Sequence, residues 1–139
     1  MIKVTDKLWV SGQPTDADVA AAGEAGVRRI VNNRPENEEP SQPSMADAAA
    51  LAGQAGMDFV NIPVAPGRYT LETVRAFQKA VVEADGPVLA HCKGGTRSAT
   101  LWAIGEVLDG RMSADELDAV GQRLGINFAG AKDWLRNNN

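Results

Sequence analysis

The stretch that decides the fold, residues 88–102, reads VLAHCKGGTRSATLW. Its apolar start predicts a short buried strand over Pro87 to Ala90, and an apolar-periodic segment predicts a helix from Ser98 to Leu108. The glycine pair Gly94-Gly95 lies in the loop between them. A strand, a glycine-bearing loop and a helix N-terminus together collect backbone N–H groups around an anion-binding concavity.

Cys92 stands at the start of this loop, at the bottom of the predicted concavity. The loop amides, the positive end of the helix, Lys93 and Arg97 are expected to favour the thiolate form of its sulfur. Thr96 and Ser98 could donate further hydrogen bonds to the sulfur or could instead cap the helix. A thiolate beneath a ring of donors is a nucleophile aimed at a bound oxyanion. The competing interpretation is a small structural cysteine in a tight turn, with Arg97 as a surface charge.

Strand and helix patterns alternate around this loop. Further strands are predicted within Ile2–Val10, Val27–Asn32 and Asp58–Val64, and helices after the capping residues Thr15, Ser44, Thr70 and Ser113. The polar, proline-punctuated segment Glu36 to Ser44 predicts an exposed loop. This alternation predicts a three-layer α/β fold with a mostly parallel central sheet of about four to five strands flanked by helices, in a single domain over residues 1–139.

Ligands of such sheets bind beyond the carboxyl ends of the strands. Four predicted loops lie there, at Gln13-Pro14, Asn33-Arg34, Pro66–Arg68 and Cys92–Arg97. Gln13, Arg34 and Arg68 are therefore candidates to help Arg97 hold an anion. The alternative for both added arginines is an ordinary exposed position.

Composition narrows the classes of partner. The net charge of −4 argues against nucleic acid, and no apolar run approaches the length of a membrane span. One cysteine excludes an internal disulfide, so we expect a cytoplasmic protein. His91 is the only histidine, and its position next to Cys92 favours a role in orienting the loop, so no metal site and no cofactor are expected.

The motif His91-Cys92…Gly95…Arg97-Ser98 resembles the signature of cysteine-dependent phosphatases of the dual-specificity kind. Together with residues 8–14 (LWVSGQP) and 30–35 (IVNNRP), it resembles the phosphatase-like domain family of bacterial beta-lactamase-hydrolase-like proteins, over the chain up to about Leu108. The resemblance implies a cysteine-phosphatase-like fold in which Cys92 is the nucleophile. It also implies that Arg97 and the loop of Lys93, Gly94, Gly95 and Thr96 hold the anion, that Ser98 steadies the thiolate and that His91 helps orient the loop.

Two features depart from the phosphatase pattern. Four residues, Lys93 to Thr96, separate Cys92 from Arg97, whereas phosphatases of this fold have five; the shorter loop is similar to that of rhodanese-type sulfurtransferases. The loop of residues 65–69 also carries no carboxylate where those phosphatases have their general acid. Losing that acid costs about 10²–10⁴-fold in rate, whereas sulfur transfer from thiosulfate expels sulfite and needs none.

We therefore expect a sulfurtransferase that forms a persulfide on Cys92. Its substrates would be a small oxyanion or persulfide donor and an external thiol or cyanide acceptor, and Arg68 would suit a dianionic donor. The first alternative is a phosphatase with a phosphocysteine intermediate. The second is a non-catalytic module that only binds oxyanions.

Overall fold

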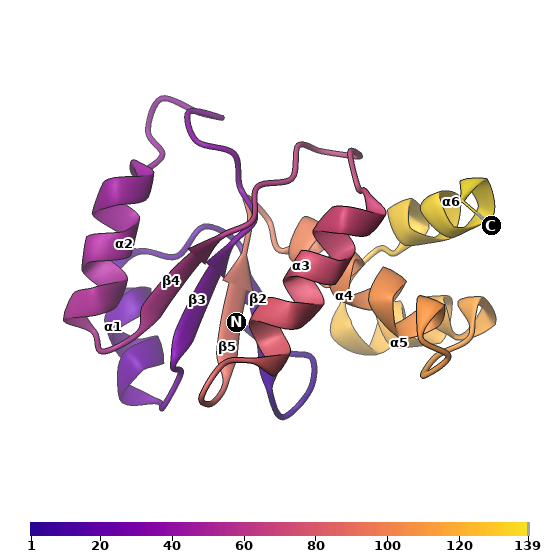
Figure 1. Ribbon diagram of the computed structural model, residues 1–139, viewed down its shortest axis with the longest axis horizontal. Helices are drawn as coiled ribbons and strands as arrows, with labels where there is room; N and C mark the ends of the chain where they lie inside the picture. Colours follow the sequence, from indigo (N-terminus) through magenta and orange to yellow (C-terminus); the bar gives the residue numbers. More distant parts are fainter. Residues whose placement is uncertain (139) are drawn as a thin grey trace.

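A five-stranded sheet forms the middle layer of the computed structural model, which describes residues 1–138; Asn139, the last residue of the expected domain, lies outside the described part (Figure 1). The strand order is β1-β2-β5-β3-β4. The strands are β1 (Ile2–Lys3), β2 (Leu8–Ser11), β3 (Arg29–Asn32), β4 (Asp58–Asn61) and β5 (Val88–His91). Only β1 pairs in the antiparallel sense, so the mostly parallel sheet that the sequence predicts is confirmed.

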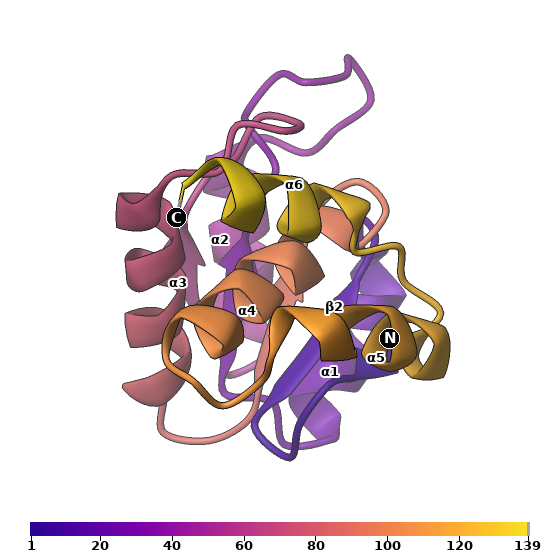
Figure 2. The same ribbon diagram turned by 90° about the vertical axis from the view of Figure 1, so that its right-hand side faces the viewer.

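Helices cover both faces of the sheet, as Figure 1 shows. On one face lie α1 (Asp16–Glu24) and α2 (Met45–Gln54), and on the other lie α3 (Leu71–Val82), α4 (Thr96–Leu108), α5 (Leu117–Leu124) and α6 (Ala129–Asn137). Seen from the side in Figure 2, α4 is enclosed by α3, α5 and α6. No helix within residues 1–138 combines the length and the apolar character needed to cross a membrane.

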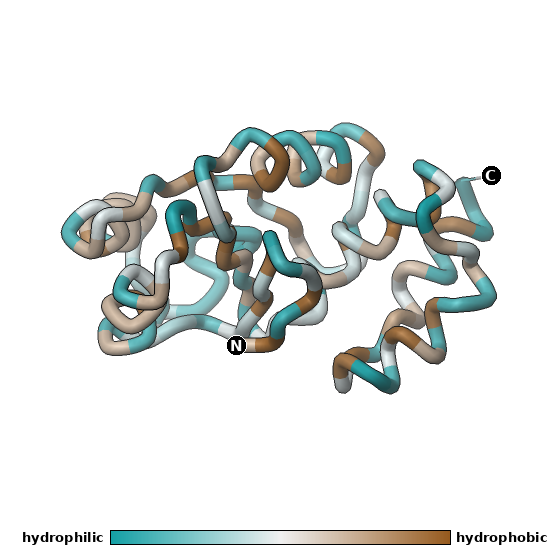
Figure 3. The backbone as a smooth tube through the Cα atoms, turned by 90° about the horizontal axis from the view of Figure 1, so that it is seen from below, coloured by the Kyte–Doolittle hydropathy of each residue, from teal (hydrophilic) through white to brown (hydrophobic). Residues whose placement is uncertain are grey.

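Strand alternation sends neighbouring side chains into two separate cores. Ile30 and Leu89 pack with α1 and α2, whereas Val31 and Ala90 pack with the helices of the opposite face. Hydrophobic and hydrophilic residues alternate along the helices in Figure 3, as expected for elements with one buried side. Leu71, the first residue of α3, and Val82, its last, are exposed, at 52% and 75%.

The carboxyl ends of β2, β5, β3 and β4 meet at one edge of the sheet, where the four candidate loops leave it. At the end of β5 the chain turns directly into α4, which begins at Thr96, two residues before the predicted start. Gly95 makes this turn possible because its φ of 96° lies in the left-handed region that other L residues rarely adopt. The turn places Cys92 between the end of a buried strand and the start of a buried helix.

Gly12 and Gly95 let two of these loops touch. A Cβ atom on Gly12 would lie 2.7 Å from the carbonyl oxygen of Lys93, and one on Gly95 would lie 3.3 Å from the carbonyl carbon of Ser11. The resulting contact is held by a hydrogen bond of 3.1 Å from the Gln13 N–H to the Lys93 carbonyl. The loop after β2 therefore braces the cysteine loop from one side.

Substituting Gly95→Ala is expected to destabilise the fold by about 1–2 kcal/mol, because alanine must adopt a left-handed φ and also meets the backbone of Ser11. Gly94→Ala is the matched control, since the φ of Gly94 is not positive and a Cβ atom there would meet nothing within 4 Å. Urea denaturation of both variants measures the difference in unfolding free energy. Equal stability of the two would contradict the strain argument.

Candidate active site

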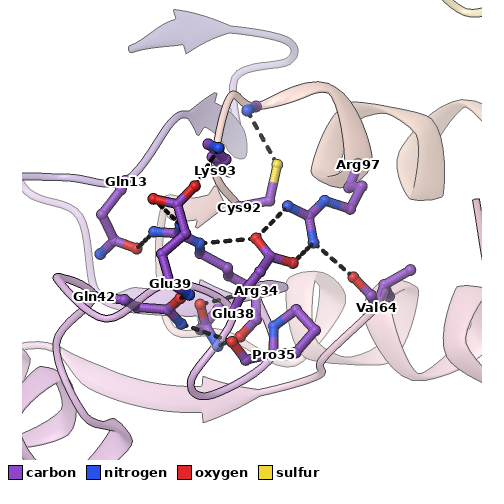
Figure 4. A network of polar contacts seen from close by, with 12 residues as sticks. Gln13, Arg34, Pro35, Glu38, Glu39, Gln42, Val64, Cys92, Lys93 and Arg97 are labelled. Carbon is purple, nitrogen blue, oxygen red and sulfur yellow. Dashed lines mark hydrogen bonds and ion pairs between the residues drawn. The ribbon is translucent and has the colours of Figure 1, made fainter. Parts of the chain in front are cut away.

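Cys92 lies directly after β5 and is fully buried. Its Sγ accepts a hydrogen bond of 3.0 Å from the Gly95 N–H, which Figure 4 shows across the loop. No side chain caps the N-terminus of α4, so the first-turn amides of this helix, beginning at Thr96, remain available to a ligand. Loop amide and helix dipole together make the surroundings of the sulfur favourable for negative charge.

Arg97 extends from the first turn of α4 along the mouth of this loop. Its Nη1 donates to the carbonyl oxygen of Val64 at 2.9 Å, which fixes the guanidinium against the segment after β4. Both terminal nitrogens also donate to Glu38, with Nη1 at 2.8 Å from Oε2 and Nη2 at 2.9 Å from Oε1. Arg97 thus presents the forked geometry that holds two oxygens of one anion.

Arg34 brings a second guanidinium to the same place from the end of β3, and its side chain is only 4% exposed. Its Nε donates to Oε1 of Glu38 at 3.0 Å, and its Nη1 donates to Oε1 of Gln13 at 3.1 Å. The structure therefore brings Gln13, Arg34 and Arg97 together beside Cys92 from separate loops (Figure 4).

The acidic residues of the loop after β3 are the part of the site that sequence reasoning missed. The segment Glu36 to Ser44 has no regular structure, as predicted, but Glu38 is not exposed: its side chain retains 19% of its accessible surface and bridges Arg34 and Arg97. The hydrogen bond from Arg97, followed by that from Arg34, lowers the pKa of Glu38 to about 2. The signal in the sequence that could have found this carboxylate is the expected meeting of Arg34 and Arg97 at one edge of the sheet with no acidic residue among the candidates to balance their charge.

Two asparagine side chains fix the loops beneath the arginines. Asn32 donates from Nδ2 to the carbonyl of Arg34 at 2.7 Å. Asn33 donates from Nδ2 to the carbonyl of Ile62 at 2.8 Å and accepts at Oδ1 from the Ser98 hydroxyl at 2.7 Å. The single hydroxyl proton of Ser98 is therefore directed to Asn33 and not to the sulfur of Cys92, which differs from the expectation for Ser98. Here Ser98 ties the start of α4 to the end of β3.

Other expected site residues lie at the rim. Lys93 is exposed and pairs with Glu39, and Gly94 and Thr96 are exposed as well, in contrast to the buried sulfur. Arg68 is exposed, and within residues 1–138 its guanidinium makes no hydrogen bond or ion pair. The structure thus does not join Arg68 to the arginine pair as expected.

The segment of residues 65–69 contributes Tyr69 instead. Burial raises the pKa of Tyr69 above its ordinary value, and the positive charge of Arg97 acts in the opposite direction. Its carbonyl accepts a hydrogen bond of 3.0 Å from Nε1 of Trp134, which anchors this loop to α6. Residues 65–69 thus contribute a phenol with a raised pKa and no carboxylate.

His91 ends β5 and faces the α1 and α2 side of the sheet, in line with Leu89. Its side chain is buried, and burial lowers its pKa from 6.5 to about 4, so the imidazole is neutral at neutral pH. Its backbone carbonyl accepts a hydrogen bond of 2.7 Å from the Asn33 N–H. A role of the His91 ring in orienting the loop stays a prediction.

The depressed pKa of His91 predicts a specific loss of stability in acid. The unfolded chain takes up a proton near pH 6.5 and the folded chain only near pH 4, so stability falls as the pH drops through this window, by up to about 3 kcal/mol from this group. The His91→Asn variant keeps a polar side chain but cannot titrate. Urea denaturation across the window should give a shallower loss for the variant; parallel curves would show that His91 does not titrate as inferred.

Comparison with known proteins agrees with the motifs. Residues 1–109 match the family described as beta-lactamase hydrolase-like protein, phosphatase-like domain. The beta-lactamase hydrolase-like protein of Agrobacterium fabrum (strain C58) is 42% identical over 134 residues, which cover 96% of this chain and 31% of the relative. The chain therefore spans about a third of the length of the curated relatives it matches.

Solved structures extend the agreement to three dimensions. A putative phosphatase from Neisseria meningitidis Z2491 is 34% identical, with a TM-score of 0.87, and the match covers 98% of this chain and 96% of that one. PTPMT1, at 18% identity and a TM-score of 0.70 over 95% of this chain and 88% of its own, shares the fold. The resemblance inferred from residues 8–14, 30–35 and 91–102 is thus confirmed, and the chain belongs to the phosphatase-like domain family of beta-lactamase hydrolase-like proteins.

Proposed function

We propose that this domain is a cysteine-dependent phosphatase, in place of the sulfurtransferase that loop length first suggested. The observation that carries the proposal is the pair Arg34 and Arg97, which hold two oxygens of one anionic group at the mouth of the Cys92 loop. A phosphoryl group offers the same arrangement of oxygens with a higher charge. The family match and the likeness to a putative phosphatase support this reaction class.

In the proposed reaction the Cys92 thiolate attacks the phosphorus of a phosphate monoester. The S–P bond forms as the ester O–P bond breaks, and the leaving oxygen takes a proton from an acid or from water. Water then attacks the phosphocysteine, the S–P bond breaks, and inorganic phosphate leaves with the thiolate restored. The Gly95 amide, the first-turn amides of α4 and Arg97 would stabilise the charge on the transferring group.

Sulfur transfer is the second candidate, and a specific observation favours it. Four residues separate Cys92 from Arg97, which makes a smaller ring of donors than a five-residue spacing. In that reaction Cys92 attacks the outer sulfur of thiosulfate, a persulfide forms and sulfite leaves. An external thiol must then take the sulfur, because the chain has one cysteine.

Parallel assays with an aryl phosphate and with thiosulfate distinguish the two reactions. We expect wild-type protein to turn over the aryl phosphate and Cys92→Ser to be inactive, with phosphocysteine detected on wild-type protein by rapid-quench mass spectrometry. Addition of a sulfur atom to Cys92 by thiosulfate, without ester turnover, would replace the phosphatase proposal by the sulfurtransferase. Failure of both reactions would leave an oxyanion-binding module.

Variants of two arginines test the anion clamp in the same assay. Arg97→Gln removes the forked donor and is expected to lower kcat/KM for the aryl phosphate by about 10²–10³-fold. Arg68→Gln is the matched control, because this guanidinium is exposed and unpaired within the described residues, and it should change the rate less than about threefold. An equal loss in both variants would contradict the placement of the clamp.

A further inference from the structure

The loop that carries Glu38 is attached to the domain mainly through the site itself. We call residues 36–43 the acidic loop; it holds Glu36, Glu38 and Glu39. Its internal hydrogen bonds run between Glu39, Gln42 and Pro35. Within residues 1–138, every hydrogen bond and ion pair from the acidic loop to a residue outside 34–44 ends on Lys93 or Arg97, which belong to the cysteine loop and its helix.

Glu38 takes the position at the arginine pair that a substrate anion would need. Its Oε1 accepts from both Arg34 and Arg97, and its Oε2 accepts from Arg97 alone. Figure 4 shows this carboxylate between the two guanidinium groups, on the side where Cys92 lies. An incoming oxyanion cannot use the same donors while the carboxylate remains there.

We propose that Glu38 is a specificity-determining residue: an internal competitor that reserves the arginine pair for anions able to replace both of its carboxylate oxygens at once. The inference rests on the proposed function in one respect, that the substrate anion binds to Arg34 and Arg97. It applies equally to phosphoryl transfer and to sulfur transfer. The favoured class is a tetrahedral dianion, such as a phosphate monoester, because it offers three free oxygens and two charges. A halide ion has a single atom to accept hydrogen bonds, and a monoanion carries half the charge of a dianion.

The competition is strong because Glu38 is tethered. A side chain on a short loop competes at an effective concentration on the order of millimolar, so a monoanion with comparable hydrogen bonds gains little at lower concentrations. Glu38 stays ionised at neutral pH, since its pKa is about 2, and it therefore competes throughout the physiological range. A dianion gains from each guanidinium a stronger charge-assisted interaction than the carboxylate does.

Arg34 acts as a second anion-binding residue in this scheme. Its guanidinium is almost fully buried and contacts Gln13, Glu38 and Glu39, so displacement of Glu38 would leave its Nε without an acceptor. A dianion large enough to contact both Arg97 and Arg34 provides a new acceptor for the Nε of Arg34. An anion that contacts only Arg97 does not. A small or singly charged anion would leave this buried donor of Arg34 unpaired, which costs free energy. Such anions are therefore expected to bind more weakly than a dianion that contacts both arginines.

The test is the affinity of inorganic phosphate, measured by isothermal titration calorimetry on the wild-type chain, Glu38→Gln and Glu36→Gln. Phosphate binding needs no turnover, so the result does not depend on which reaction Cys92 performs. We expect Glu38→Gln to bind phosphate about tenfold more tightly or better, and to bind nitrate measurably, because the internal competitor has lost its charge. Glu36→Gln, which changes the same charge on the same loop at an exposed position, should match the wild type.

A change of phosphate affinity in the opposite direction would overturn the proposal. If Glu38 only positions Arg97 for substrate, Glu38→Gln will bind phosphate no better than the wild type, or more weakly. Thermal melting of each variant shows whether the fold survives, and a loss of fold in Glu38→Gln is resolved by Glu38→Asp. The shorter side chain keeps the charge but withdraws it from the pair, so it should also tighten phosphate binding.

Hydrogen exchange gives a second, independent readout on the wild-type chain. Phosphate is expected to slow exchange of the amides at 93–98 while it speeds exchange of the amides at 36–43, because the acidic loop loses its attachment to Arg97. A ligand that merely stabilised the domain would slow both segments. Slower exchange of the acidic loop with phosphate bound would therefore contradict displacement of Glu38.

Discussion

The left-handed turn at Gly95 is the constraint on which the site depends. With a φ of 96° there, the chain passes from the buried end of β5 into the buried start of α4 within four residues of Cys92. The same turn directs the Gly95 amide at the sulfur and lets the backbone of Ser11 lie against the loop. A side chain at this position would oppose the turn and the contact together, so the position of the Cys92 sulfur and the packing of the neighbouring loop are linked.

Charge balance at the carboxyl edge of the sheet follows from that placement. The turn holds Arg97 beside Cys92, and Arg34, two residues beyond the end of β3, is almost fully buried at the same edge. Two such guanidinium groups need an anion, because an unpaired buried charge is costly. Glu38 supplies it in the free domain, with a pKa of about 2 that records how strongly the arginines favour its charged form. In the proposed scheme a substrate anion takes over this role, which would couple binding to the state of the acidic loop.

The parts of the fold that the sequence predicted are those set by short-range patterns. The capping residues Thr15, Ser44 and Thr70 begin helices as expected, and the alternation of strands and helices led to the parallel sheet. The predicted strand Asp58–Val64 is too long, because its residues follow one largely apolar pattern although the strand in the structure, β4, ends at Asn61. Glu38 was missed because its burial comes from partners 4 and 59 residues away in the chain, and polar sequence alone reads as an exposed loop.

The placement of Glu38 adds a further condition to the chemical argument that favoured sulfur transfer. That argument had two parts, the four-residue spacing in the cysteine loop and the missing carboxylate after β4. The structure does bring a carboxylate, Glu38, to the site from the loop after β3, but its pKa of about 2 keeps it ionised, so it pairs with the arginines and supplies no proton. The four-residue spacing and the absence of a carboxylic acid on residues 65–69 therefore both remain. Under the proposal that Glu38 is displaced by substrate, the choice between the two reactions depends on which anion can displace it and present its reacting atom to Cys92, and on which leaving group can depart without a proton from the protein.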